Sequence, residues 1–178
     1  MPNSFTTKCS SMKRTKHANH PGFTMAELLA AVAIAGTLSA LAIPAYTSQT
    51  NKIKQKQAQA TMSQVMSAIS VFNDEFGISA KTWKDIDEIA TIITISGPAA
   101  ADDLEPITLK SSGYILEVTN SGNDYKLSAY STNDKEFQPE IVTYNVLGCL
   151  NIRTGASDIA TGNLKTPATW EQVKCQNT

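Results

Sequence analysis

The stretch His20-Pro-Gly-Phe-Thr-Met-Ala-Glu-Leu-Leu-Ala-Ala-Val-Ala-Ile-Ala-Gly36 decides the organisation of this chain. Its Gly22-Phe23 junction opens an apolar run that extends to Ile43 and contains one charge, Glu27. As a helix rising about 1.5 Å per residue, a run of this length spans roughly 30 Å, which is about the thickness of a bilayer core. The sequence therefore predicts one membrane helix close to the N-terminus.

The residues before this run have the composition of a targeting segment. Residues 1–22 contain four basic side chains, no acid, both histidines of the chain and Cys9, whereas the remainder of the chain is net acidic. Basic residues ahead of a membrane helix favour a cytoplasmic N-terminus and an exported C-terminal part. We therefore expect a single-pass protein of a prokaryotic cytoplasmic (inner) membrane, although Lys52, Lys54 and Lys56 on the other side of the run weaken that orientation.

One alternative is an ordinary secretory signal peptide. Ala40-Leu41-Ala42 resembles a small-residue cleavage site, and cleavage there would release a soluble exported binding domain that begins at Ile43. The long basic region and the length of the apolar run count against this alternative. Glu27 counts against it most, because a charge within a membrane costs roughly 2.5–3.5 kcal/mol on insertion scales and is by default functional.

The segment Gly22-Phe23-Thr24-Met25-Ala26-Glu27-Leu28-Leu29 closely resembles the processing motif of type IV prepilins and pseudopilins. The resemblance covers about residues 16–46 and implies that a prepilin peptidase cuts after Gly22 and methylates the new N-terminal residue, Phe23. Glu27 then becomes the glutamate at the fifth mature position, which the resemblance implies pairs with the amine of Phe23 on a neighbouring subunit during assembly. Gly36 and Pro44 fall where that family commonly has a helix glycine and a helix proline.

Beyond the apolar run, the pattern predicts that one helix continues to the middle of the chain. Pro44 lacks an N–H group and should kink the helix or loosen it locally. A polar, helix-favouring stretch follows, and then a stripe at spacings of three and four residues that ends before Gly77. We expect a helix from about Thr24 to Phe76 that buries this apolar stripe against a globular domain. The stripe consists of Met62, Val65, Met66, Ile69, Phe72 and Phe76.

The rest of the chain has the pattern of a small α+β domain. Thr82 and Asp85 indicate a capping box for a short helix over 82–90. Strands are expected at 114–119 and 125–131, joined by a glycine-containing turn, then at 141–147 with 149–152 as an extension or a fourth strand, while 154–169 is expected to form an exposed loop.

The predicted fold class is therefore α+β, in which a long N-terminal helix packs on a small antiparallel β-sheet. The helix would have a membrane-spanning half and an amphipathic half, and the whole would form a pilin-like roll. The expected parts are a leader peptide (1–22), a membrane or filament-core helix (23–46), an amphipathic half-helix (47–77) and a globular head with a C-terminal disulfide loop (78–178).

The cysteine count favours one disulfide in the exported part. If the leader with Cys9 is removed, Cys149 and Cys175 remain as an even pair, although two free thiols stay an alternative. The family that the motif resembles often carries such a pair around a C-terminal surface loop.

Several kinds of chemistry are missing from the sequence. After cleavage at Gly22 no histidine remains, which excludes Ser-His-Asp catalysis and the usual histidine zinc sites. No phosphate-binding glycine loop and no dense set of calcium-binding oxygens are present, so we expect no enzyme activity, cofactor or metal. Residues 77–178 hold 13 acids and 8 bases, which does not indicate direct nucleic-acid binding.

The resemblance implies a structural subunit, most simply a minor type IV pilin, that is assembled into a surface filament. Its partners would be the prepilin peptidase and methylase, other pilin subunits, an inner-membrane assembly platform and the cytoplasmic membrane. The final location would be an extracellular pilus or a periplasmic pseudopilus. A pseudopilin of a type II secretion or competence system is the alternative, because the N-terminal motif is common to both.

Overall fold

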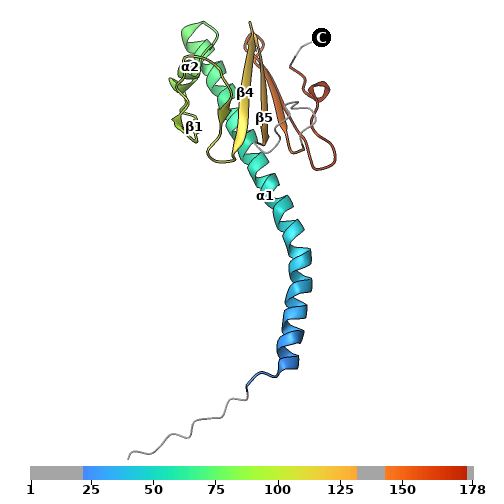
Figure 1. Ribbon diagram of the computed structural model, residues 1–178. Coiled ribbons are helices and arrows are strands. Elements are labelled where there is room, and N and C mark those ends of the chain that lie inside the picture. The colour runs from blue at the N-terminus through green and yellow to red at the C-terminus, as the bar shows by residue number, and fades with distance from the viewer. Residues whose placement is uncertain (1–21, 132–142, 176–178) are drawn as a thin grey trace, which may run out of the picture. The chain divides into compact units, whose positions relative to one another are not determined.

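A computed structural model describes residues 22–131 and 143–175 of the chain, without the side chains of residues 41, 42, 44 and 45 (Figure 1). Most of the predicted leader lies outside the described residues. The chain divides into two compact units, Met1–Ala42 and Ile43–Thr178, and each is considered by itself.

The helix α1 covers Met25–Phe76 and has 52 residues. Its polar middle is rich in Gln, Lys and Ala, which are good helix formers. It ends at Phe76, as expected, because the next residue, Gly77, adopts a φ of 70° and donates its N–H to the carbonyl of Asn73 at 2.8 Å. The backbone is helical through Pro44, whose side chain is not described, so the predicted kink stays a prediction.

The prediction of a membrane-spanning half is wrong for the part of the chain that the structure describes. None of its helices is both long enough and apolar enough to cross a membrane. The apolar stretch of α1 whose side chains are described without a break, residues 25–40, is shorter than the roughly 20 residues that a bilayer core requires, and it contains the Glu27 carboxylate. The predicted single-pass location in an inner membrane is overturned by the same finding.

The largest sheet has five antiparallel strands that follow one another in chain order, β3-β4-β5-β6-β7. A separate two-stranded sheet precedes it, and the short helices α2 (Trp83–Asp87) and η1 (Trp170–Gln172) complete the described elements. The strands are β1 (Ile93–Thr94), β2 (Gly97–Pro98), β3 (Ile107–Thr108), β4 (Tyr114–Ser121), β5 (Asp124–Ser131), β6 (Val146–Asn151) and β7 (Ala156–Thr161).

The predicted pilin-like roll with a three- or four-stranded sheet is therefore wrong. The predicted hairpin is present as β4 and β5, with Gly122 in its turn at a φ of 71°. The short strands β1 and β2 of the smaller sheet were not predicted, nor were two strands of the large sheet. The strand β3 has two residues, too few for an alternating pattern, and β7 lies in the range that was expected to be a loop because it is rich in Ala, Ser and Thr.

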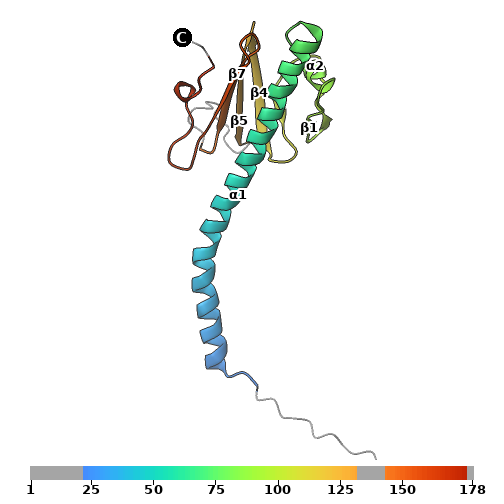
Figure 2. The same ribbon diagram turned by 180° about the vertical axis from the view of Figure 1, so that it is seen from behind.

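Within the second unit, the C-terminal part of α1 covers one face of the large sheet, as both ribbon views show (Figures 1 and 2). The predicted stripe faces the sheet, except that Phe76 is half-exposed at the helix end. The core between helix and sheet joins side chains of α1, α2 and β4 to β6, among them Met62, Val65, Ile69, Trp83, Ile86, Leu116, Tyr125, Leu127 and Val146.

The helix α2 is fixed by its cap and by one buried aromatic side chain. The capping box of Thr82 and Asp85 is confirmed, although α2 is shorter than the predicted 82–90. Trp83 is fully buried and donates its indole N–H to the carbonyl of Glu105 at 2.8 Å. Because an indole N–H needs a partner when buried, this bond ties the loop before β3 to α2.

A buried cluster of polar groups joins α1 to the sheet and to the C-terminal segment. Gln55 Nε2 donates to the carbonyls of Asn145 at 3.0 Å and of Gly162 at 2.6 Å. The Asn145 side chain exchanges two further hydrogen bonds with the backbone of Ala168, at 2.9 and 2.7 Å. We call Gln55, Asn145, Gly162 and Ala168 the clasp. A Cβ atom on Gly162 would overlap Asn145 Oδ1 and the Ala168 backbone, so glycine is required there.

The clasp predicts the effect of removing its helix donor. Gln55→Leu keeps the size of the side chain but leaves the buried carbonyl of Gly162 without this donor. Unfolding of the full chain in urea, followed by the fluorescence of buried Trp83, should show a loss of about 2 kcal/mol. The matched control is Gln57→Leu, an exposed position on the same helix that should change stability by less than about 0.5 kcal/mol. Equal effects of the two substitutions would contradict the role of the clasp.

Candidate functional site

The predicted processing junction lies at the start of α1, where Thr24 and Glu27 bond to each other. The carboxylate oxygen Glu27 Oε2 accepts the Thr24 backbone N–H at 2.9 Å and the Thr24 hydroxyl at 2.8 Å. In return, the Glu27 backbone N–H donates to Thr24 Oγ1 at 3.2 Å. This reciprocal pattern is a capping box with Thr24 at the N-cap and Glu27 at N3.

The same bonds set the charge state of Glu27. The backbone N–H of Thr24, and after it the Thr24 hydroxyl, lower the pKa of the Glu27 carboxyl below its ordinary value of 4.5. The side chain is exposed, and both described bonds fall on Oε2, so Oε1 is accessible to an incoming donor. At neutral pH the site thus presents a fixed negative charge four residues after Phe23.

The first unit surrounds this carboxylate with exposed apolar side chains. From Gly22 to Ala40 every residue is exposed, with Phe23 at 82% and Val32 at 69%. Isolated exposed apolar residues are ordinary, but a continuous apolar surface of this length marks an interaction site. The other exposed large side chains here are Met25, Leu28, Leu29, Ile34 and Leu38.

Comparison of the chain with protein-family models, with curated proteins and with solved structures found no match. The type IV pilin family therefore stays a prediction from the motif at Gly22–Leu29.

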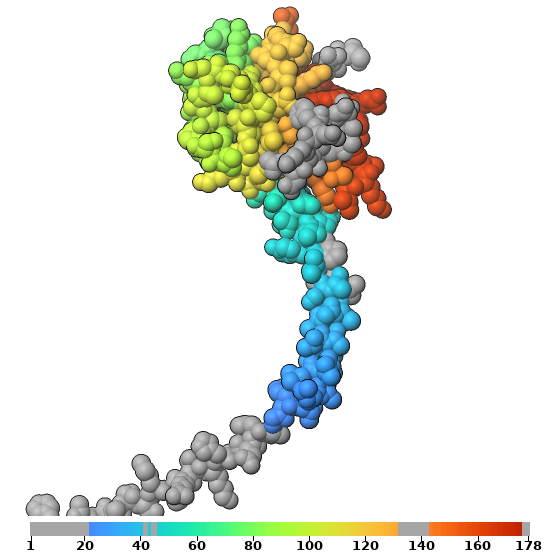
Figure 3. Space-filling view, in the orientation of Figure 1, coloured from blue at the N-terminus to red at the C-terminus, as the bar shows by residue number. Residues whose placement is uncertain are grey.

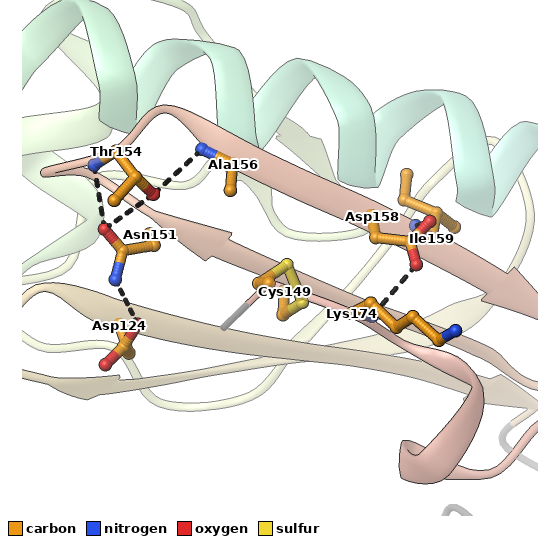
Figure 4. The surroundings of a disulfide bond; sticks show 9 residues. Asp124, Cys149, Asn151, Thr154, Ala156, Asp158, Ile159 and Lys174 are labelled. Carbon is orange, nitrogen blue, oxygen red and sulfur yellow. Dashed lines mark hydrogen bonds between the residues drawn. A yellow bond between two sulfur atoms is a disulfide. The ribbon is translucent and has the colours of Figure 1, made fainter. Parts of the chain in front are cut away.

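The disulfide is the second predicted feature, and it belongs to the other unit. Cys149 on β6 and Cys175 are joined, with Cα atoms 5.8 Å apart, which confirms the predicted pair (Figure 4). Nearby, Asp158 Oδ2 on β7 accepts the backbone N–H of Lys174 at 2.9 Å. The C-terminal segment is thus fastened to two neighbouring strands.

The fastened segment encloses a hollow on the face of the sheet away from α1. The strand register places Lys126, Cys149 and Asp158 in one row, because paired residues share a face. Lys126 Nζ lies 5.5 Å from the centre of the Trp170 ring, within cation–π range. The hollow has a volume of about 480 Å³. Within the described ranges, no three His, Cys, Asp or Glu side chains are grouped to hold a metal ion.

The role of Glu27 in capping the start of α1 was not predicted from the sequence. The Thr-x-x-Glu spacing at Thr24 and Glu27 is the same signal that identified the cap at Thr82, and it was available in the sequence. Gln55 and Asn145 had no such signal, because their partners are backbone groups distant in the chain.

The capping geometry predicts how the start of α1 responds to acid. Because the pKa of Glu27 is lower in the folded chain than in an unfolded one, the carboxylate stabilises the first turn above about pH 4.5. That contribution is lost only as the pH falls through the lowered value. The ¹³Cα shifts of residues 24–28 should therefore change with a midpoint below 4.5. The control is Glu27→Gln, which cannot titrate and should show no such transition. A midpoint above 4.5 in the unmodified chain would contradict the capping interaction.

The disulfide predicts a second effect on stability. Replacing both Cys149 and Cys175 by serine should lower the free energy of unfolding by about 3 kcal/mol, because without the disulfide the unfolded chain gains the entropy of an open loop. Urea unfolding of the full chain measures this. Cys9→Ser is the matched control and should leave the midpoint unchanged. An unchanged midpoint in the double variant would show that the clasp alone holds the segment.

Proposed function

We propose that this chain is a filament subunit of the type IV pilin kind, assembled through its N-terminal helix after cleavage at Gly22. The observation that carries the proposal is the exposed, largely apolar surface of residues 22–40, which contains one exposed carboxylate, Glu27. Burying apolar surface is favourable by about 25 cal/mol per Å², so copies of this helix gain from packing against one another. A filament core made of such helices would bury the surface.

In this proposal Glu27 has two successive partners. Before assembly its Oε2 caps the helix through Thr24. Cleavage after Gly22 creates an amine on Phe23, and in the filament the amine of a neighbouring copy would reach the accessible Oε1. A buried charge is costly when unpaired, and a paired one mainly specifies position. Glu27 would therefore set the register of neighbouring helices more than it strengthens their contact.

The remaining partners follow from the same proposal. They are a prepilin peptidase that cuts and methylates, further copies or related subunits, and an assembly machinery. We assign no catalytic role to the chain. The disulfide-fastened C-terminal segment supports a pilus subunit, most simply a minor one, over a pseudopilin of a secretion or competence fibre.

One observation favours a second candidate, a soluble exported binding domain. The second compact unit begins at Ile43, which is the residue that cleavage after Ala40-Leu41-Ala42 would make the new N-terminus. That cleavage would remove the exposed apolar surface altogether, together with Glu27. The two candidates thus differ in the first residue of the mature protein.

N-terminal sequencing and mass measurement of the mature protein decide between them. We expect a chain that starts with N-methylated Phe23; a start at Ile43 would overturn the filament proposal and support the second candidate.

A substitution of Glu27 tests the assembly step separately. Glu27→Ala should still be cut after Gly22 but should lose at least about tenfold of its incorporation into sedimentable filaments, because the amine of the neighbouring copy then has no carboxylate to pair with. Glu75→Ala, an exposed acid at the other end of α1, is the control and should assemble normally. Normal incorporation of the Glu27 variant would remove the proposed role of that carboxylate.

A further inference from the structure

One side of α1 carries exposed apolar side chains just before the helix reaches the sheet. Over residues 46–57, Ser48 and Gln55 face the head: Ser48 Oγ lies 3.4 Å from Tyr144 Oη, and Gln55 belongs to the clasp. At about 100° per residue, Tyr46 and Ile53 point to the opposite side. They are 73% and 57% exposed.

Three exposed lysines surround Ile53: Lys52, Lys54 and Lys56. Lys52 and Lys56 are four residues apart, a spacing at which like charges destabilise a helix. Between Glu27 and Asp74, α1 contains no acid that could offset them. By the same rotation Lys54 and Lys56 lie on either side of the direction of Tyr46 and Ile53, whereas Lys52 lies nearer the side of Gln55. We call Tyr46, Ile53, Lys54 and Lys56 the stalk face. It combines two apolar side chains with two positive charges.

The head carries a surface of the opposite character in the segment from α2 to β3. Residues 81–105 contain six acids and two lysines. Ile93 and Ile95 of the same segment are also exposed, Ile95 at 68%. Figure 3 shows this part of the chain, in green and yellow, covering one side of the head. We call five of its exposed residues, Ile93, Ile95, Asp102, Asp103 and Glu105, the head patch; Lys81 and Lys84 of the same segment are exposed as well.

The acidic end of the head patch is held in a fixed position. The Trp83 backbone N–H donates to the carbonyl of Asp103 at 2.9 Å, and the Lys84 N–H donates to the carbonyl of Ala101 at 3.1 Å. Together with the indole bond to Glu105, these contacts fasten the loop to the first turn of α2. A loop held in this way presents its carboxylates with little loss of conformational entropy on binding.

The acidic end of the patch lies too far from the stalk lysines of its own copy to pair with them. The helix α2 begins at Trp83, soon after α1 ends at Phe76, and both ribbon views place it near that end (Figures 1 and 2). Lys56 precedes Phe76 by 20 residues, which corresponds to roughly 30 Å along the helix axis. Pairing of opposite charges therefore requires a second molecule displaced along the axis.

We propose that the stalk face of one copy docks on the head patch of a neighbouring copy, lysines against carboxylates and Tyr46 and Ile53 against Ile93 and Ile95. The inference rests on the proposed filament function and names the contact between subunits outside the helical core. The occupant is a second copy because the same chain supplies both charge-complementary surfaces. Exposed ion pairs are individually weak, so the contact acts on partner choice and on axial offset.

Charge reversal with rescue tests the docking in the full chain. Lys54→Glu with Lys56→Glu should lower the yield of sedimentable multimers about tenfold, and Asp102→Lys with Asp103→Lys should do the same. A chain that carries all four substitutions restores the complementarity and should recover multimers. Lys165→Glu, at an exposed position outside both surfaces, is the control. Unchanged urea midpoints verify that the reversed chains still fold.

A cysteine pair tests the contact directly. Two differently tagged full-length copies, one with Lys54→Cys and one with Asp103→Cys, should form an oxidised heterodimer. Lys165→Cys with Asp103→Cys should not.

The outcomes separate the docking from the filament. Three outcomes would overturn the docking and leave the filament proposal standing. They are multimers that form despite both charge reversals, charge reversals that the fourfold variant does not rescue, and the absence of the oxidised heterodimer. An unsubstituted chain that stays monomeric would overturn both, and the Glu27→Ala assay reports on the core contact independently of either charge swap.

Discussion

The two hydrogen bonds from Gln55 Nε2 to the carbonyls of Asn145 and Gly162 are the constraint on which the arrangement of the head depends. The apolar stripe of α1 would pack on the sheet in many positions, because burial of apolar surface has no direction. One side-chain amide that must reach two fixed carbonyls selects a single rotation and a single axial position. Since Asn145 also binds Ala168, that selection extends to the C-terminal segment.

The structural features that could be predicted from the sequence depend on residues close together in the chain, and those that could not depend on residues far apart in it. The stripe from Met62, the cap at Thr82 and the hairpin around Gly122 are set by neighbours within a few residues, and all three are present. The edge strand β7 (Ala156–Thr161) has little β propensity of its own and exists because β6 offers it a partner. The prediction of a membrane-spanning half was wrong for the described part of the chain. The lone carboxylate of the apolar run, Glu27, takes part in a local capping box with Thr24.

The local role of Glu27 is compatible with the intermolecular role that we propose for it. Its bonds to Thr24 keep the carboxylate ionised and fix its direction at the first turn. An ionised group that is already ordered loses less entropy when it gains a further donor on its second oxygen. A helix cap is thus a suitable precursor for the pairing that the proposed filament needs.

The clasp also has a consequence for the order in which the head is completed. The strands of the large sheet pair with their successors along the chain, so their contacts close short loops, whereas Gln55 and Gly162 are 107 residues apart. Loop-closure entropy makes such long-range contacts slow to form. During synthesis from the N-terminus, α1 emerges well before the residues that position it. The ribosome must release almost the entire chain before helix and sheet can acquire their final alignment.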